Sequence, residues 1–266
     1  MTQHVNRRNF GLISACGLAY AMTGCSPGRS FRGSDVGEGM GAYRQPNPCP
    51  PISNRVDNLL TNVIGEGARI DRLATRIAPA NESITLVQLP SREFTNGSSI
   101  ARCLITCEPL TVASNVLPFR RGQYDPATTE GGRLFFALAA ADIGIGVAQG
   151  IALRNISLRF DGQADGSGFG QVVGTYQGEF GPISESVEGP SGPRGLNLEE
   201  GQNFSNFELA CLRSIGCRER TKEALARRGV DYRRVDFPIS ATEHRSRGPR
   251  YRKASFEIEF RLADCT

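Results

Sequence analysis

The chain has little of what most enzymes and nucleotide-binding proteins use. Of its 266 residues none is tryptophan, which excludes nothing, and two are histidines. His4 stands in a leader-like start, so His244, in a polar arginine-rich loop, is the histidine left for chemistry. No Gly-x-Ser-x-Gly is present, and no glycine-rich segment leads into the Gly-Lys-Ser/Thr of a phosphate-binding loop. These absences argue against a hydrolase or a nucleotide-binding protein.

Lysine is also scarce, since only Lys222 and Lys253 are present, and nearly all positive charge is arginine. The formal net charge is +4, with 39% hydrophobic and 22% charged residues, which is ordinary for a globular protein. Arginine binds carboxylates through a planar two-pronged fork, which a lysine ammonium cannot reproduce. The composition therefore permits recognition of carboxylates but does not by itself name a ligand.

Near its start, the chain has no apolar run long enough to span a bilayer. Its first residues nevertheless have the pattern of an export signal. Arg7-Arg8 precede a short apolar run from Phe10 to Ala21 that contains neither acid nor lysine. A run of this length is typical of a signal peptide and not of a transmembrane helix. We therefore expect residues 1–24 to be removed on export.

Met22-Thr23-Gly24-Cys25 resembles the box at which bacterial lipoproteins are cleaved and acylated, which implies lipidation of Cys25. Ser26 follows, where an aspartate commonly retains such proteins in the inner membrane, so we expect the periplasmic face of the outer membrane. Asn6 to Phe10 also resembles a twin-arginine export motif. The alternative is an ordinary secretory signal with two adjacent arginines.

Eight cysteines are present, of which Cys16 lies in the signal and Cys25 is the expected lipidation site. An even number of remaining cysteines in an exported chain predicts at least two disulfides, including one that joins the N-terminal part to the rest. Zinc is the alternative, although no C-x-x-C pair occurs, and we expect no metal site. The disulfide candidates are Cys49, Cys103, Cys107, Cys211, Cys217 and Cys265.

The chain beyond the signal divides into three parts by composition. Residues 25–50 are rich in Gly, Pro, Ser and Arg, which predicts a flexible tether. Residues 51–110 predict a helix over 53–78, a strand near 83–89 and a short apolar stretch from Cys103 to Cys107, which together form an N-terminal elaboration.

The third part, residues 111–266, shows the clearest order of elements. Gly, Ser and Pro dominate residues 166–202, where we expect an insertion with one strand or hairpin near 172–180. The order outside it is β-α-β-α-β-β, which predicts an α/β (α+β) sandwich with helices on one face of a mixed sheet. The expected elements are strand 112–119, helix 128–149, strand 156–161, helix 206–228, strand 235–239 and strand 256–262.

This third part resembles the OmpA-like peptidoglycan-binding domain, the family of the peptidoglycan-associated lipoproteins. The family shows a strand ending in G-H-T-D, a helix with N-x-x-L-S-x-x-R-A, then G-[IV], a strand containing R-[IV], and a last strand of alternating charge. The matching residues are Gly162-Gln163-Ala164-Asp165, Asn206, Leu209, Ala210, Arg213, Ser214, Gly229-Val230, Arg234-Val235 and Phe256-Glu257-Ile258-Glu259-Phe260.

The resemblance implies that Asp165 and Arg213, with Asn206 beside them, bind the diaminopimelate side chain of a peptidoglycan stem peptide. That group is a zwitterion, so a carboxylate suits its ammonium and a guanidinium suits its carboxylate. Each residue also has a structural alternative: Asp165 in a turn, Arg213 on a solvated helix face, Asn206 as a helix N-cap. Separation of Asp165 from Arg213 would favour these alternatives, whereas proximity would favour binding.

The resemblance therefore implies a non-enzymatic, lipid-anchored protein that links the outer membrane to the cell wall without a cofactor. Its expected partners are peptidoglycan, the membrane that holds the lipid, and other envelope proteins, and an exported chain argues against nucleic acid. The alternative function is a structural or partner-binding lipoprotein that keeps the fold but has lost the ligand site, which the insertion at 166–202 would favour.

Overall fold

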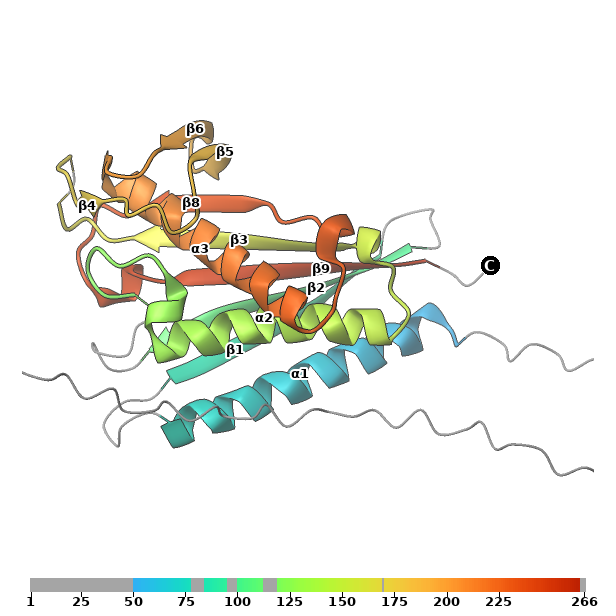
Figure 1. The fold of residues 1–266 in the computed structure, drawn as a ribbon. Helices are drawn as coiled ribbons and strands as arrows, with labels where there is room; N and C mark the ends of the chain where they lie inside the picture. Colours follow the sequence, from blue (N-terminus) through green and yellow to red (C-terminus); the bar gives the residue numbers. More distant parts are fainter. Residues whose placement is uncertain (1–49, 78–83, 95–99, 112–118, 169, 264–266) are drawn as a thin grey trace, which may run out of the picture. The chain divides into compact units, whose positions relative to one another are not determined.

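In the computed structural model, the described residues are 50–77, 84–94, 100–111, 119–168 and 170–263, and they form a mixed α/β protein (Figure 1). The helices are α1 (Ile52–Ile77), α2 (Glu130–Ala148) and α3 (Asn206–Arg227). The strands are β1 (Ile84–Phe94), β2 (Ile100–Thr111), β3 (Ile156–Ala164), β4 (Gly174–Thr175), β5 (Ile183–Gly189), β6 (Gly192–Leu198), β7 (Asn203–Phe204), β8 (Ile239–Glu243) and β9 (Ala254–Ala263). The predicted signal, its lipidation site at Cys25 and the tether up to residue 49 lie outside the described residues.

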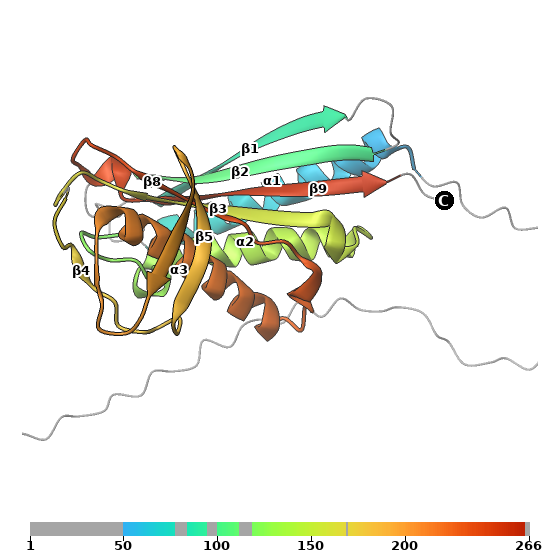
Figure 2. The ribbon, with the colours of Figure 1, turned by 90° about the horizontal axis from the view of Figure 1, so that it is seen from above.

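The main sheet is mixed, with strand order β1-β2-β9-β3-β8-β5-β6. β3 and β5 run parallel to β8, and the other neighbouring strands are antiparallel. All three long helices lie on one side of this sheet (Figure 2). The sequence-based expectation of a mixed sheet with helices on one face is therefore confirmed.

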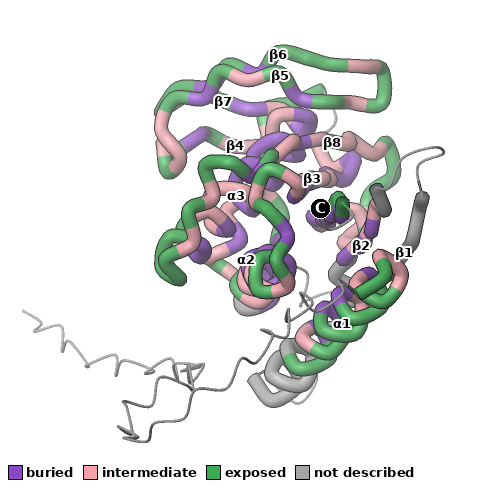
Figure 3. The backbone as a smooth tube through the Cα atoms, turned by 90° about the vertical axis from the view of Figure 1, so that its right-hand side faces the viewer, coloured by how far each residue is buried: buried purple, intermediate pink, exposed green. Residues whose placement is uncertain are grey.

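Alternation along the strands decides which face the helices cover. In β3, Ile156, Leu158 and Phe160 are buried, while Arg159 between them is exposed. Figure 3 shows the buried residues gathered between the helices and the sheet. The face of the sheet that the helices do not cover carries charges that pair across strands, such as Glu259 of β9 with Arg102 of β2. The period of two thus gives each strand one apolar and one polar face.

Helix α2 is the most apolar helix of the fold. Within the described residues, the stretch Gly131–Ala148 alone has the length and hydropathy of a membrane span, but 61% of it is buried inside the protein. Gly146 lets α2 approach the sheet closely, because a Cβ there would lie 2.4 Å from the Phe260 ring. This is the packing of a core helix in a globular protein.

Helix α3 begins where local sequence signals place it. The Ser205 hydroxyl accepts a hydrogen bond from the Glu208 N–H, and the Glu208 carboxylate accepts one from the Ser205 N–H. This reciprocal capping box satisfies N–H groups that the helix itself leaves unpaired. After Arg227 the chain passes through Gly229 at φ 71°, a conformation that favours glycine at a helix end. The expected helix over 206–228 is therefore confirmed.

The first strand of the β-α-β-α-β-β order differs from the expectation. Residues 112–118 of the predicted strand lie outside the described residues, and Phe119 belongs to no strand. The strand beside β9 is β2, which contains Cys103 and Cys107 and pairs with β9 from Ile100 to Cys107. The expected N-terminal elaboration thus contributes two strands of the main sheet.

The segment 166–202 contains more strands than the one strand or hairpin expected near 172–180. The hairpin is β5–β6, which turns between Gly189 and Gly192 and extends the main sheet beside β8. The predicted stretch supplies only the short β4, paired with β7. Likewise, β8 begins at Ile239 rather than Val235: Val235 caps the short 3-10 helix Tyr232–Arg234, and Asp236 forms an isolated bridge with Ser157.

Close contact between β3 and α3 depends on Gly162. A Cβ at this position would lie 2.0 Å from the Ala210 carbonyl oxygen and 2.7 Å from the Ser214 hydroxyl. We expect Gly162→Ala to lower the free energy of unfolding by about 1–3 kcal/mol, the usual range for overpacking. The measurement is urea unfolding. The control is Gly144→Ala in α2, where a Cβ meets nothing within 4 Å. Equal stability of both variants would contradict the prediction.

Candidate functional site

The predicted site residues meet at the carboxyl end of β3. Asp165 directly follows that strand, and Asn206 and Arg213 lie on α3. The Arg213 Nη1 donates to the Gln163 carbonyl, 50 positions away in the sequence. The Asn206 Nδ2 donates to the Ser167 carbonyl at 3.2 Å. Both contacts are to residues two positions from Asp165. The structure therefore brings the predicted residues together, although segment 166–202 separates them in the sequence.

Arg213 is completely buried and is not on a solvated helix face. Its Nε donates to the Gln123 carbonyl at 2.9 Å and its Nη2 to the Arg120 carbonyl at 3.3 Å, in addition to the Gln163 contact. Its guanidinium lies over the Phe119 ring, 4.9 Å from the centroid. Burial lowers the pKa of Arg213 to about 9, an effect that the nearby Asp165 charge opposes. The side chain therefore carries its charge at neutral pH.

Asp165 is 3% exposed, and one of its carboxylate oxygens gathers three partners. Oδ2 accepts hydrogen bonds from the Ser167 hydroxyl at 2.8 Å and the Gly248 N–H at 3.1 Å, and the Arg252 Nε lies 3.2 Å away. Burial alone would raise the pKa of Asp165, but these hydrogen bonds and the Arg252 charge outweigh it and lower the pKa. Asp165 is therefore a carboxylate at neutral pH.

Asn206 is the first residue of α3 and is 1% exposed. Ser205 holds the N-cap position, so the alternative interpretation of Asn206 as the cap is wrong. Within the described residues, its Oδ1 accepts no hydrogen bond, although its Nδ2 is paired with Ser167. An unpaired buried amide oxygen is costly. This oxygen is an acceptor available to a ligand.

Two loop segments cover this cluster with their backbones. One is 119–123, whose carbonyls bind Arg213. The other is 244–252, the β8–β9 connection: the Gly166 N–H donates to the Ser246 carbonyl at 2.9 Å, and Gly248 binds Asp165. The His244 ring packs against Tyr251, with 4.6 Å between centroids. The two segments therefore cover the three predicted site residues in this structure.

Arg252 and Gly248 are site residues that the sequence-based interpretation missed. The available signal was the density of arginine around His244, which was assigned only to a polar loop. Nothing local to residues 244–252 indicates that they contact a residue about 80 positions earlier in the chain.

The disulfide candidates have different surroundings. Cys211 and Cys217 are buried free thiols on α3, so no bridge forms at these two positions in the structure. Burial raises the pKa of the Cys211 thiol to about 12, which makes it a poor nucleophile. Cys103 and Cys107 are buried in β2. Cys49 and Cys265 lie outside the described residues. Across the described part of the chain, no cluster of His, Cys, Asp and Glu is suited to a metal ion.

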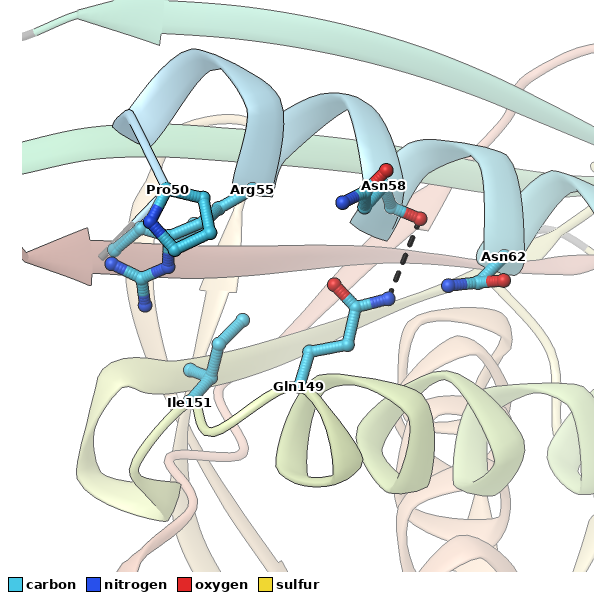
Figure 4. A pocket seen from close by; sticks show the side chains of 7 residues that line it. Pro50, Arg55, Asn58, Asn62, Gln149 and Ile151 are labelled. Carbon is cyan, nitrogen blue, oxygen red and sulfur yellow. Dashed lines mark hydrogen bonds between the residues drawn. The ribbon is translucent and has the colours of Figure 1, made fainter. Parts of the chain in front are cut away.

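A separate pocket of about 440 Å³ lies between the start of α1 and the end of α2 (Figure 4). Two polar residues that line the pocket already form hydrogen bonds within the protein. The Arg55 Nη1 donates to the Ala263 carbonyl at 2.6 Å, and the Gln149 Nε2 donates to the Asn58 carbonyl at 3.4 Å. No predicted site residue lines it. The lining residues are Pro50, Arg55, Asn58, Asn62, Gln149, Ile151 and Leu262.

Comparison with known proteins gives no relative. No family model, no curated protein and no solved structure matches this chain. Its function is therefore inferred from its own residues and their geometry.

Proposed function

We propose that this protein binds peptidoglycan non-covalently from the periplasmic face of the outer membrane, where acylated Cys25 anchors it and residues 25–50 act as the tether. The single observation that carries this proposal is the convergence of Asp165, Asn206 and Arg213 on the Gln163–Ser167 segment. The element order β2-α2-β3-α3-β8-β9 supports an OmpA-like fold, with β4 to β7 as its insertion.

The chemistry of the site suits the zwitterionic end of diaminopimelate. Asp165 is ionised and accepts cationic partners, as its ion pair with Arg252 demonstrates. A guanidinium fork suits a ligand carboxylate, although the three side-chain nitrogens of Arg213 donate to backbone carbonyls in this structure. Asn206 offers its unpaired Oδ1 to the ligand ammonium or to a peptide N–H.

Binding at this site requires an exchange of partners. Arg252 now holds the position beside Asp165 that a ligand ammonium would take. The ligand carboxylate would likewise replace one or more of the carbonyls around Arg213. The ligand therefore competes with the protein's own 244–252 segment, and its affinity is reduced by the free energy of opening that segment.

One observation favours a second candidate function. Asp165, Asn206 and Arg213 are each at most 3% exposed, and protein groups already satisfy the two charges. If the 244–252 segment does not open, the cluster only stabilises the packing of β3, α3 and the two loop segments. The protein is then a structural or partner-binding envelope lipoprotein.

Co-sedimentation with purified peptidoglycan sacculi tests the proposal. We expect the wild type to sediment and free diaminopimelate to weaken its binding to the sacculi. We expect Asn206→Ala and Asp165→Asn to bind at least tenfold more weakly, since truncating one partner of a buried charge contact typically costs about 2–5 kcal/mol. The matched control is Asp231→Asn, an exposed carboxylate paired with Arg233, which should bind normally.

Competition by free diaminopimelate requires no mutation, so it stays decisive even if a variant folds poorly. Thermal melting of each variant identifies such cases. A wild type that does not sediment, or whose affinity for sacculi is unchanged by free diaminopimelate, would favour the partner-binding function.

A further inference from the structure

Arginine is concentrated on the two loop segments that cover the candidate site. The β8–β9 connection carries Arg245, Arg247 and Arg250, and the segment before α2 carries Arg120 and Arg121. All five residues are exposed. We call these five residues the arginine rim.

Among the described residues, the five arginines of the rim have no carboxylate partner, a property that they share with Arg154, Arg228 and Arg234 but not with the arginines paired on α3. Arg218 pairs with Glu185 at 2.5 Å, and Arg220 with Asp125 at 2.6 Å. Within the described ranges, by contrast, no residue of the rim forms an ion pair. Arg250 instead donates to the Tyr251 hydroxyl and lies over its ring. The rim is thus a patch of one charge sign that the fold leaves uncompensated.

The backbone holds these arginines at the edge of the closed site. The Arg120 carbonyl accepts a hydrogen bond from Arg213. The Arg245 carbonyl lies so close to Gly166 that a Cβ on that glycine would be 2.2 Å from it. The main chains of both segments therefore face inward onto Asp165 and Arg213, while their arginine side chains are exposed.

The two arginine-bearing segments lie at the opposite end of the sheet from the start of α1. In Figures 1 and 2 the β8–β9 connection and the segment before α2 lie at one end of the sheet. The start of α1, where the chain enters the folded part at Pro50, lies at the other end with the end of β9. The arginine rim thus lies at the end of the folded part opposite to the start of α1.

We propose that the arginine rim is a second binding surface, which takes free carboxylates of neighbouring stem peptides in the peptidoglycan mesh. This inference rests on the proposed function and adds a site outside the diaminopimelate pocket. Guanidinium groups pair with carboxylates in a bidentate fork, which fits an all-arginine surface. Several exposed contacts act together on a repeating polymer, so the rim raises avidity and makes wall binding sensitive to salt.

The experiment compares two triple variants of equal net charge. Arg245→Gln/Arg247→Gln/Arg250→Gln removes three charges from the rim. Arg154→Gln/Arg228→Gln/Arg234→Gln removes three charges from other exposed arginines, which lie in or beside the connections at the far ends of α2 and α3. Both variants are measured with sacculi, with soluble poly-L-glutamate and with vesicles containing anionic phospholipid, each over a range of salt concentrations.

We expect the rim variant to bind sacculi and poly-L-glutamate about tenfold more weakly at low salt, because each exposed ion pair is worth about 0.2–1 kcal/mol. The control variant should match the wild type. We also expect wild-type protein in saturating free diaminopimelate to retain a weaker, salt-sensitive binding to sacculi that the rim variant lacks.

The outcomes separate this inference from the proposed function. Equal binding by the two triple variants would contradict carboxylate binding at the arginine rim, while leaving the proposal of the diaminopimelate site unaffected. Stronger binding of the wild type to anionic vesicles than to sacculi would also overturn it, in favour of a membrane surface. Failure of free diaminopimelate to compete, with rim-dependent binding to sacculi preserved, would overturn the pocket and support the rim.

Discussion

Replacing Arg213 by alanine is expected to lower the free energy of unfolding by about 3–5 kcal/mol, the range for removing one partner of a buried charged network. The substitution leaves the carbonyls of Arg120, Gln123 and Gln163 without their shared donor in a buried site. It also removes the guanidinium that lies over the Phe119 ring, and it leaves Arg252 as the remaining cation beside Asp165. Urea unfolding at pH 7 measures the loss.

The control for this substitution is Arg227→Ala on the same helix. Arg227 is 64% exposed and lies 3.8 Å from Glu223, so its loss should change stability by no more than about 0.5 kcal/mol. Arg213→Lys should fall between the two, because an ammonium cannot reach three divergent carbonyls at once. A stability for Arg213→Ala within error of the Arg227→Ala value would show that the buried network contributes nothing.

Asp165→Ala is expected to destabilise the protein by about 3 kcal/mol at pH 7, because Arg252 and the Gly248 N–H lose a buried partner. The effect should depend on pH. The folded protein lowers the pKa of Asp165, so the stabilisation is present above the unfolded-state pKa of about 3.9. It is lost as the pH falls through the still lower folded-state pKa. The wild type and the variant should therefore converge in stability below about pH 4.

The matched control is Glu185→Ala, which removes another arginine-paired carboxylate from a more exposed place. The Glu185 side chain is 32% exposed, against 5% for Asp165, so solvent screens its pair with Arg218. We expect a loss of about 1 kcal/mol or less for this variant. A difference between wild type and Asp165→Ala that stays constant from pH 7 to pH 3 would contradict the assigned role of the Asp165 charge.

The site illustrates how far sequence reasoning reaches. The residues Asp165, Asn206 and Arg213 could be selected because their spacing within each element matches a known motif, and the structure places them together. Their burial could not be predicted, since solvent exposure depends on which loops lie above them. Arg252 escaped selection for the same reason, because its partner Asp165 is distant in sequence.

The sequence by itself determined the elements whose signals are local. Ser205 and Glu208 place the start of α3, Gly229 marks its end, and the alternation from Phe256 to Leu262 defines β9. Capping and periodicity act within a few residues, so they can be recognised without the rest of the chain.

Only the tertiary structure decided which segments complete the sheet and close the site. β2 joins β9, and β5–β6 extends the sheet beyond β8, although each lies in a stretch that the sequence assigned elsewhere. Backbone carbonyls and N–H groups make most of the contacts to Arg213 and Asp165, and every residue type carries them. Such contacts depend on where the chain passes in space, so they cannot be predicted from a pattern of side chains.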